Sequence, residues 1–370
     1  MVISRYSQLD TPALLIDDSI MRSNILAMQE KADKAGVKLR PHTKTHKMPE
    51  LAKLQVAAGA SGITVAKVGE AEVMADHGLQ DIFIANEIVG TAKIERIREL
   101  SRRIAIRLGV DNAFQVDQLQ EVFRDEPHPI EVLIEIETGE NRSGVISDGQ
   151  LIELTKHILG KTKVALKGVF SHEGNSYKAK TVEDCRRICI ESQTRTLEAA
   201  NMARGLGAVI DTVSIGSTPS LMHSEILAGV TEIRPGTYIF MDVGQGTAIS
   251  DYSRCAATVL ATVISMPTDE RIVLDTGAKA LTLQTRGEGI CATTGYGLVK
   301  GSADIRLSGM FDEHGLIYDA QLRKELEVGS KLEIIPNHIC PVCNLYDSAY
   351  LVSDGKVLRN LPIAGRGKTQ

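Results

Sequence analysis

Residues 19–40, SIMRSNILAMQEKADKAGVKLR, contain one complete unit of the pattern that decides the fold. Apolar residues recur there at alternating spacings of four and three, which places them on one face of a helix. They are Met21, Ile25, Met28 and Ala32. Gly36 ends the helix, because glycine accepts the left-handed conformation common at helix C-termini. Residues 37–40 follow at once as a short strand, so the stretch predicts a helix that runs directly into a strand.

The same alternation of strand and helix continues to about residue 235. Alternation of this kind predicts a parallel sheet, and eight such units predict a closed (β/α)8 barrel of the TIM type. Several of the intervening helical segments end at a glycine, as helices commonly do. The predicted strands span residues 37–40, 62–66, 81–85, 104–108, 130–137, 164–170, 212–215 and 230–234.

The pattern changes after about residue 250, where strand-like runs are separated by Gly, Asp and Pro turns without intervening helices. These runs span residues 256–265, 271–274, 331–335 and 350–352. A C-terminal, mainly-β domain is therefore predicted, and the early strand at residues 13–16 is expected to pair with it. The predicted domains are a barrel at 18–248 and a β domain at 1–17 and 249–370, which suits a chain of 370 residues.

Composition excludes several classes of function. The net charge is -5 and the charged residues are scattered evenly, so a nucleic-acid partner is not expected. The N-terminus lacks an apolar signal core, and no apolar run approaches the roughly 18 to 20 residues of a membrane span. A cytoplasmic protein without membrane contact is therefore expected. Its six cysteines are expected to be free thiols or metal ligands, not a disulfide framework.

The first barrel strand ends in the segment 40–47, RPHTKTHK. Reactive groups of such barrels lie at the carboxyl ends of the strands. A lysine held there among His and Arg can have its amine pKa lowered, which favours a Schiff base with an aldehyde cofactor. Lys44 is the candidate and Lys47 the alternative, although an isolated lysine would more simply belong to a solvated turn.

Two loops near the ends of the seventh and eighth predicted strands are candidates for binding a phosphate. Residues 214–220, SIGSTPS, offer hydroxyl groups and backbone N–H groups. Residues 234–238, RPGTY, follow the next strand, and the loops after strands seven and eight often bind phosphate in this fold. Either loop alone is also compatible with an ordinary turn.

Strands five and six supply further polar residues. Arg142, in ETGENRSG at 137–144, is expected to hold an anionic oxygen such as a phenolate. His172 and Tyr177, in SHEGNSY at 171–177, offer an imidazole face that can stack on an aromatic ring and a phenol close to it. We expect Lys44 and Tyr177 to be the catalytic residues.

A candidate metal site lies in the C-terminal part, in the segment PNHICPVCN at 336–344. If the segment is extended, His338 and Cys340 point to the same side. An imidazole and a thiolate suit an ion such as Zn²⁺ or Mn²⁺, and two protein ligands leave positions open for water or substrate. Cys343 is a possible further ligand. The alternative is a pair of buried cysteines beside an unrelated histidine.

Taken together, these motifs resemble the fold-type III pyridoxal 5′-phosphate (PLP) enzymes, and more narrowly the D-threonine aldolase and D-serine dehydratase family. The resemblance covers nearly the whole chain, from DTPAL at 10–14 to GRGK at 365–368. It implies an alanine-racemase-like barrel in which Lys44 binds PLP, His172 stacks on its ring and Arg142 approaches its phenolate. It also implies a metal at His338 and Cys340 and a homodimer. The phosphate would be bound by Gly216, Ser217, Thr218, Gly236 and Tyr238.

The resemblance leaves the reaction open between two lyases that act on small D-3-hydroxy amino acids. The segments 67–72 and 86–90 look more like the aldolases, which cleave Cα–Cβ to give glycine and an aldehyde. The thiol at Cys340 and the loop at 216–220 look more like the dehydratases of D-serine or D-3-hydroxyaspartate, which give a 2-oxo acid and ammonia. The D-threonine aldolase reaction is favoured. An amino-acid racemase or a PLP-binding regulator without catalysis are weaker alternatives, because neither accounts for a metal site in a second domain.

Overall fold

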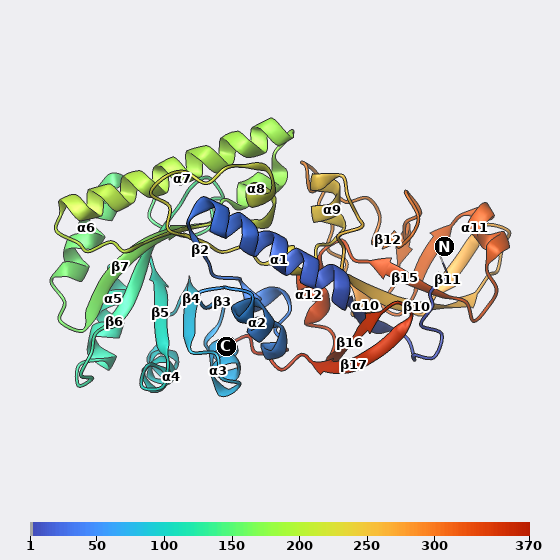
Figure 1. Ribbon diagram of the computed structural model, residues 1–370, viewed down its shortest axis with the longest axis horizontal. Coiled ribbons are helices and arrows are strands. Elements are labelled where there is room, and N and C mark those ends of the chain that lie inside the picture. The colour runs from blue at the N-terminus through green and yellow to red at the C-terminus, as the bar shows by residue number, and fades with distance from the viewer. Residues whose placement is uncertain (1–2) are drawn as a thin grey trace. The chain divides into compact units, whose positions relative to one another are not determined.

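The structure is a computed structural model that describes residues 3–370 (Figure 1). The chain forms two compact units. The barrel unit comprises Met28–Lys44, Pro49–Gly236 and Gly367–Gln370. The β unit comprises the chain up to Ala27, Thr45–Met48 and Thr237–Arg366. The units thus divide the chain at other points than the domain boundaries expected after residues 17 and 248, and those boundaries stay a prediction.

The barrel unit contains the eight predicted parallel strands. Their order in the sheet is β2-β9-β8-β7-β6-β5-β4-β3, so most strands lie beside their neighbours in sequence. A parallel bridge between His42 and Thr64 links the segments after β2 and within β3, which joins the two ends of the sheet and confirms the predicted barrel. The strands are β2 (Lys38–Leu39), β3 (Ile63–Val65), β4 (Asp81–Glu87), β5 (Ala105–Val110), β6 (Ile130–Ile136), β7 (Val164–Ser171), β8 (Thr212–Ile215) and β9 (Glu232–Ile233).

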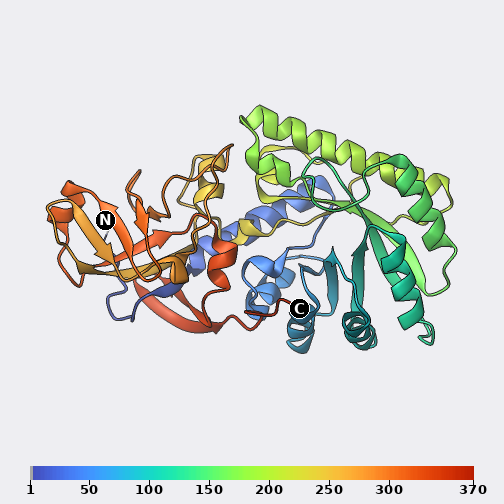
Figure 2. The ribbon, with the colours of Figure 1, turned by 180° about the vertical axis from the view of Figure 1, so that it is seen from behind.

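Helices of the barrel unit connect the strands and lie outside the sheet in the front and rear views (Figures 1 and 2). Short polar side chains cap the starts of α5, α6 and α7, as at α6, where Ser147 and Gln150 form a capping box. Their inner faces and the outer faces of the strands form one large apolar cluster. The helices are α2 (Pro49–Ala57), α3 (Val68–Asp76), α4 (Thr91–Ser101), α5 (Ala113–Val122), α6 (Asp148–Leu159), α7 (Val182–Gly205) and α8 (Thr218–His223), with α1 (Asp18–Ala35) divided between the units.

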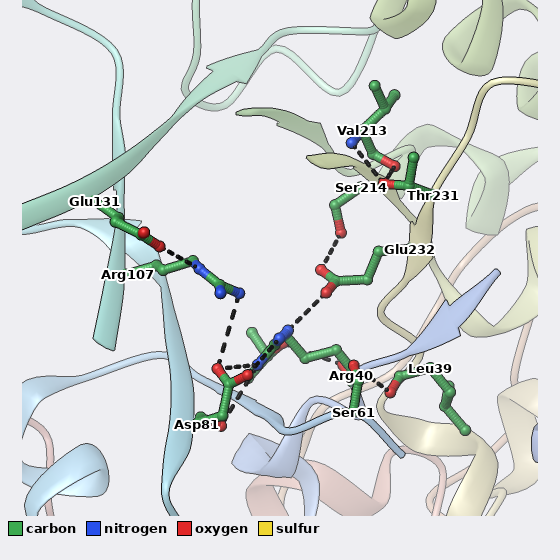
Figure 3. Close-up of polar contacts among 11 residues, drawn as sticks. Leu39, Arg40, Ser61, Asp81, Arg107, Glu131, Val213, Ser214, Thr231 and Glu232 are labelled. Atoms are coloured by element: carbon green, nitrogen blue, oxygen red, sulfur yellow. Dashed lines mark hydrogen bonds and ion pairs between the residues drawn. The ribbon is translucent and has the colours of Figure 1, made fainter. Parts of the chain in front are cut away.

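Charged side chains fill the barrel at the amino ends of its strands (Figure 3). The buried guanidinium of Arg40 contacts Asp81, at 2.8 Å, and Glu232, at 2.7 Å. Ser214 donates to the second oxygen of Glu232 at 2.6 Å. These side chains pair one another's charges and hydrogen-bonding groups, as buried charges require. We call this network the barrel floor. Residues at the amino ends of the strands in such barrels usually serve stability.

The position of Arg40 differs from the one expected from the sequence. Arg40 was expected among the cations that surround Lys44. Its side chain instead contacts Asp81 and Glu232, the first residues of β4 and β9, whereas Lys44 follows the carboxyl end of β2. Alternate residues of a strand point the same way, but a side chain as long as arginine can extend toward the opposite end of the barrel.

The β unit is built on a nine-stranded sheet. Its central strand β10 (Ala257–Ser265) pairs antiparallel with β1 (Ala13–Asp17), which also pairs parallel with β16 (Ser348–Ser353). The early strand therefore joins the C-terminal β structure, as predicted. The other strands are β11 (Arg271–Leu274), β12 (Leu298–Val299), β13 (Gly309–Met310), β14 (Gly315–Tyr318), β15 (Lys331–Ile335) and β17 (Lys356–Pro362).

The expectation that no helices intervene among these strands was wrong. Three short helices do so: α10 (Ala278–Leu281), α11 (Ala320–Glu325) and α12 (Ile339–Cys343), while α9 (Val243–Ile249) precedes β10. They are shorter than two helical turns, too short for an apolar period to show in the sequence. Side-chain caps stabilise two of these four helices: Asp242 accepts a hydrogen bond from the backbone of Gln245 at α9, and Asp319 accepts from Gln321 and Leu322 at α11.

Among the residues that the structure describes, no helix is both long enough and apolar enough to cross a membrane.

Candidate active site

Lys44 lies just beyond the first barrel strand, in the 3-10 turn Thr43–Thr45, and is exposed. Its backbone N–H donates to Nδ1 of His42 at 3.4 Å. Burial lowers the pKa of His42 well below its ordinary value, and the charges of Lys44 and Arg234 lower it further. His42 is therefore a neutral imidazole directly beside the candidate lysine.

His172 follows strand β7 and is fixed by the next strand. Its Nδ1 atom lies 3.0 Å from the carbonyl oxygen of Gly216, after β8. Burial, followed by the charges of Lys44 and Arg142, lowers the pKa of His172 to about 3. The ring is therefore neutral at physiological pH, and the structure brings together Lys44, Arg142 and His172 from three different strand ends, as the sequence predicted.

Arg142 is half-exposed in the loop after β6 and is held by two carboxylates. Its Nη2 atom lies 3.2 Å from Glu135, and its Nη1 atom lies 3.3 Å from Glu140. Glu140 also lies 3.8 Å from Nε2 of His172. The loop thus carries the guanidinium to the mouth of the barrel, next to the imidazole.

The hydroxyl-rich loop follows β8. Gly216 has a φ of +136°, and a Cβ there would lie 3.0 Å from the backbone nitrogen of Arg234, so this turn favours glycine. Ser217 and Ser220 form a capping box at the start of α8, with their hydroxyl oxygens 2.9 Å apart. Within the described chain, the hydroxyl oxygen of Thr218 is buried and has no hydrogen-bond partner. The loop therefore retains a donor for a ligand.

Glu173 is hydrogen-bonded to the hydroxyl-rich loop. Its side chain, 1% exposed, accepts a hydrogen bond from Ser220. The hydroxyl of Ser176 lies 3.1 Å from that of Ser217, which continues the same chain of hydrogen bonds. The sequence argument did not assign Glu173, although it directly follows His172.

Arg234 is a second residue that the sequence argument left without a role. Its guanidinium is buried at 5.8 Å from the ring centre of Phe83 and 5.1 Å from that of Phe170, and it donates to the carbonyl of Ser171 at 2.7 Å. Its Nη1 atom is buried without a hydrogen-bond partner among the described residues. The sequence could have marked Arg234 as a candidate site residue, because it directly follows the eighth barrel strand.

Gly236 and Tyr177 also belong to the barrel unit. Gly236 lies two residues beyond Arg234, and Tyr177 is half-buried in the 3-10 turn Gly174–Lys178 after β7. Tyr238, expected beside the same phosphate, falls in the β unit, where it is 1% exposed. Its expected part in phosphate binding stays a prediction.

Lys47, the alternative Schiff-base lysine, has another partner. Its Nζ atom donates to the side-chain oxygen of Asn344 at 3.0 Å, and the residue is 9% exposed. Both residues lie in the β unit. An ammonium group buried in this contact is a poorer nucleophile than the exposed Lys44, which favours Lys44.

The segment with His338 and Cys340 is not extended, so that premise was wrong. His338 caps helix α12, in which Cys340 is the second residue. Nδ1 of His338 lies 3.0 Å from the side-chain oxygen of Gln284, and the thiol of Cys340 lies 3.3 Å from the hydroxyl of Thr45. Because the amide oxygen accepts, it keeps the proton on Nδ1, so Nε2 is the nitrogen through which His338 would bind a metal.

No group of three or more metal-binding side chains occurs in the described part of the chain. Cys343 is fully buried, and burial raises the pKa of its thiol well above the ordinary value. A metal at this position would therefore rest on His338 and Cys340 and complete its coordination with other ligands. All six cysteines are free.

Comparison with known proteins matches both parts of the chain. Residues 16–243 match the alanine racemase N-terminal domain, and residues 256–352 match a putative serine dehydratase domain. The chain is 33% identical to a D-threonine aldolase of Arthrobacter sp, covering 98% of this chain and 94% of that protein. It is also 33% identical to the D-threo-3-hydroxyaspartate dehydratase of Delftia sp. (strain HT23), covering 94% and 96%.

The solved structure of the Delftia dehydratase superposes with a TM-score of 0.90 at 31% identity, covering 97% of this chain and 98% of that one. Further structures of that enzyme are of a histidine-to-alanine variant and of a metal-free cysteine-to-alanine variant. In that protein a single residue separates the two substituted positions, the same spacing as in His338 and Cys340.

A parallel barrel with a lysine beyond its first strand, followed by a mainly-β region, defines the fold-type III class of PLP-dependent enzymes, and the domain matches agree with it. Within this class the chain belongs to the lyase family of the D-threonine aldolases and D-serine dehydratases.

Proposed function

We propose that the protein is a PLP- and divalent-metal-dependent lyase that cleaves D-3-hydroxy amino acids by the D-threonine aldolase reaction. The observation that carries the proposal is the assembly of Lys44, Arg142 and His172 beside the hydroxyl-rich loop at the carboxyl end of the barrel. The two relatives that are each 33% identical are an aldolase and a dehydratase. Both are lyases, and they cleave different bonds of the substrate.

The site fits a phosphorylated aromatic aldehyde. The buried Thr218 hydroxyl and the Nη1 atom of Arg234 have no partner within the described protein, and buried donors normally have one. Gly216, Ser217 and Gly236 are assigned to the same phosphate by resemblance. We assign Tyr238 to the same phosphate by resemblance.

PLP, when bound, supplies an electron sink for bonds at the substrate Cα. The exposed amine of Lys44 would hold the cofactor covalently, and neutral His172 would stack on its ring. Arg142 would bind the phenolate oxygen as a charge-assisted partner. Tyr177, half-buried beyond the same strand as His172, would move a proton at the substrate.

A divalent metal such as Zn²⁺ or Mn²⁺ fits His338 and Cys340. The Gln284 contact at Nδ1 directs a metal to the other ring nitrogen of His338, and the thiol of Cys340 provides a soft ligand. The spacing of the variants of the Delftia enzyme supports the same pair. The metal would polarise the 3-hydroxyl group of the substrate.

The alternative is the dehydratase reaction on D-serine or D-3-hydroxyaspartate. The thiol at Cys340 favours it, given the metal-free cysteine variant of a dehydratase at the corresponding spacing. A racemase or a non-catalytic regulator would leave the paired His338 and Cys340 without a role. A cytoplasmic homodimer without nucleic-acid or membrane partners is part of the proposal.

Product analysis tests the proposal directly. D-threonine, D-serine and D-alanine are incubated separately with protein, PLP and Mn²⁺ or Zn²⁺. Glycine with acetaldehyde from D-threonine supports the aldolase. A 2-oxo acid with ammonia from either substrate identifies the dehydratase. L-alanine formed from D-alanine, with neither lyase product, would contradict both readings.

A further inference from the structure

Two consecutive residues after strand β7 hold the hydroxyl-rich loop at both of its ends. Nδ1 of His172 lies 3.0 Å from the carbonyl oxygen of Gly216, at the start of the loop. The next residue, Glu173, accepts a hydrogen bond from the hydroxyl of Ser220, at the other end. The proposed function uses His172, and it leaves Glu173 without a role.

The hydrogen bonds that end at Glu173 form a chain with one direction. A carboxylate only accepts, and a hydroxyl has a single proton, so Ser220 donates its proton to Glu173. The hydroxyl oxygens of Ser217 and Ser220 are 2.9 Å apart, and this contact therefore takes the proton of Ser217. The hydroxyl of Ser176, 3.1 Å from that of Ser217, donates to it in turn. All three protons thus point toward Glu173.

One other acceptor competes for the proton of Ser220. It is the carbonyl oxygen of Ser217, which lies 3.0 Å from the same hydroxyl. A hydrogen bond to an ionised carboxylate is roughly twice as strong as one to a neutral oxygen, so the carboxylate wins. The backbone N–H of Ser217 donates to the Ser220 hydroxyl oxygen at 3.4 Å, which fits a hydroxyl whose proton points away from it.

The chain of hydroxyl groups lies inside the protein. Glu173 is 1% exposed, and Ser176, Ser217 and Ser220 are buried as well. The cation that faces Glu173 is Arg234, because the charges of Glu232 and Glu173 raise the pKa of Arg234 against the larger effect of burial. A buried negative charge opposes an anion bound nearby, so the carboxylate needs another role beside a phosphate loop.

The chain divides the roles of the hydroxyl groups in this loop. Phosphate oxygens accept hydrogen bonds, whereas the proton of Ser217 is directed to Ser220. The hydroxyl of Thr218 is buried and has no partner among the described residues, so it keeps its proton for a ligand. The Ser217 hydroxyl therefore supports the loop, and the Thr218 hydroxyl is the one available to a phosphate.

We propose that Glu173 is a positioning residue that directs the hydroxyl groups of Ser220 and Ser217 into the protein and leaves Thr218 as the hydroxyl donor to a phosphate. Glu173 acts as a hydrogen-bond acceptor, and its charge is not required. The role toward the phosphate rests on the proposed function, whereas the direction of the chain does not.

Amide hydrogen exchange of the full chain without cofactor tests the hydrogen-bond chain. Glu173→Met removes the acceptor, whereas Glu173→Gln keeps one, because its amide oxygen accepts from Ser220. Exchange in the peptide that contains residues 216–224 should be faster than wild type in Glu173→Met and close to wild type in Glu173→Gln. Glu333→Met, which removes a buried glutamate that accepts from Thr258 in the β unit, should leave this peptide unchanged. Unchanged exchange in Glu173→Met, or equal acceleration in both Glu173 variants, would overturn the proposal.

Equilibrium titration with PLP tests the positioning role. Glu173→Met should weaken binding by roughly fivefold to tenfold, the effect of about one hydrogen bond. Glu173→Gln should bind PLP at least as tightly as wild type, because it keeps the acceptor and removes a negative charge. Glu333→Met should match wild type. Wild-type affinity in Glu173→Met, or tighter binding by both Glu173 variants, would show that no acceptor is needed and would overturn the role.

A double variant shows whether Glu173 acts through the loop. Ser217→Ala interrupts the same chain, so its combination with Glu173→Met should bind PLP no more weakly than the weaker single variant. Losses that multiply would overturn the chain. Ser220→Ala removes the same hydrogen bond from the side of the loop and replaces Glu173→Met if that variant does not fold. Failure of PLP to bind wild-type protein would overturn the proposed function, while hydrogen exchange still decides the chain.

Discussion

The Nδ1 atom of His172 lies 3.0 Å from the carbonyl oxygen of Gly216. A carbonyl oxygen only accepts, so Nδ1 carries the proton and Nε2 carries the lone pair. The contact ties the ring that follows β7 to the glycine that begins the hydroxyl-rich loop after β8. One hydrogen bond thus orients the proposed stacking residue and the proposed phosphate loop relative to each other within the barrel unit.

The neutral state of His172 predicts acid sensitivity. Its pKa is lowered to about 3 in the folded protein, from an ordinary 6.5, so the unfolded chain binds more protons between these values. Stability contributed by the neutral ring is present above pH 6.5 and is lost as the pH falls toward 3, by on the order of a few kcal/mol. His42, whose pKa is also lowered, acts in the same direction.

Urea unfolding of the protein without cofactor, across this pH range, measures the effect. His172→Gln should flatten the acid side of the stability profile, whereas His77→Gln, at an exposed histidine that directly follows α3, should leave it unchanged. A profile for His172→Gln that is parallel to wild type would show that the imidazole does not supply the linkage.

Lys44 should carry the cofactor. Protein mixed with PLP should be yellow, and borohydride reduction should fix the label on the peptide containing Lys44, because this amine is exposed at the end of the first strand. Lys44→Ala should abolish the label and Lys47→Ala should retain it. A label on Lys47 or Lys67 would refute the assignment.

The unpartnered hydroxyl of Thr218 should contribute to PLP affinity. A charge-assisted hydrogen bond contributes about 1.5 to 3 kcal/mol, so Thr218→Val should weaken PLP binding by at least tenfold. Ser217→Ala should also weaken it. Thr155→Val is the matched control, because Thr155 on α6 is a buried threonine whose hydroxyl also has no partner in the described chain. Equal affinities for Thr218→Val and Thr155→Val would remove Thr218 from the site.

Much of the fold was predictable because its strands and long helices appear in the sequence as regularly spaced apolar residues. All eight barrel strands and the pairing of β1 with the C-terminal sheet follow from apolar runs and their spacing. Helix α12 was missed because five residues do not complete two turns, and a short His-x-Cys segment after a strand is compatible with either state. His338, the residue just before the helix, keeps extended backbone angles, so only the part from Ile339 onward departs from the expectation.

The candidate site was predictable to the extent that it lies at strand ends. Lys44, Arg142 and His172 meet because parallel strands bring their carboxyl ends to one edge. The directions of long side chains were not predictable: Arg40 extends to the floor, and Arg234 lies over the rings of Phe83 and Phe170.

The barrel floor should be a large source of stability. Arg40→Met would leave the buried Glu232 without its cationic partner, which costs about 3 to 5 kcal/mol in comparable cases. Chemical denaturation of the protein without cofactor measures the change. Arg103→Met, which removes an exposed pair with Asp76, should cost no more than about 1 kcal/mol. Similar losses for the two variants would show that the floor is not a special source of stability.

His338 and Cys340 should hold a catalytic metal and not a structural one. A structural zinc site usually closes with four protein ligands, and the described chain offers no group of even three here. Chelation should therefore abolish turnover of a D-3-hydroxy amino acid while circular dichroism and the yellow colour persist, since Lys44 can hold PLP without a metal. Added Zn²⁺ or Mn²⁺ should restore the chelated wild type but not Cys340→Ala.

Cys343→Ala should retain turnover, because that thiol is fully buried with a raised pKa and poorly suited to binding as a thiolate. Full activity in protein shown to be metal-free would refute the mechanism, and unfolding on chelation would instead indicate a closed site that recruits Cys343.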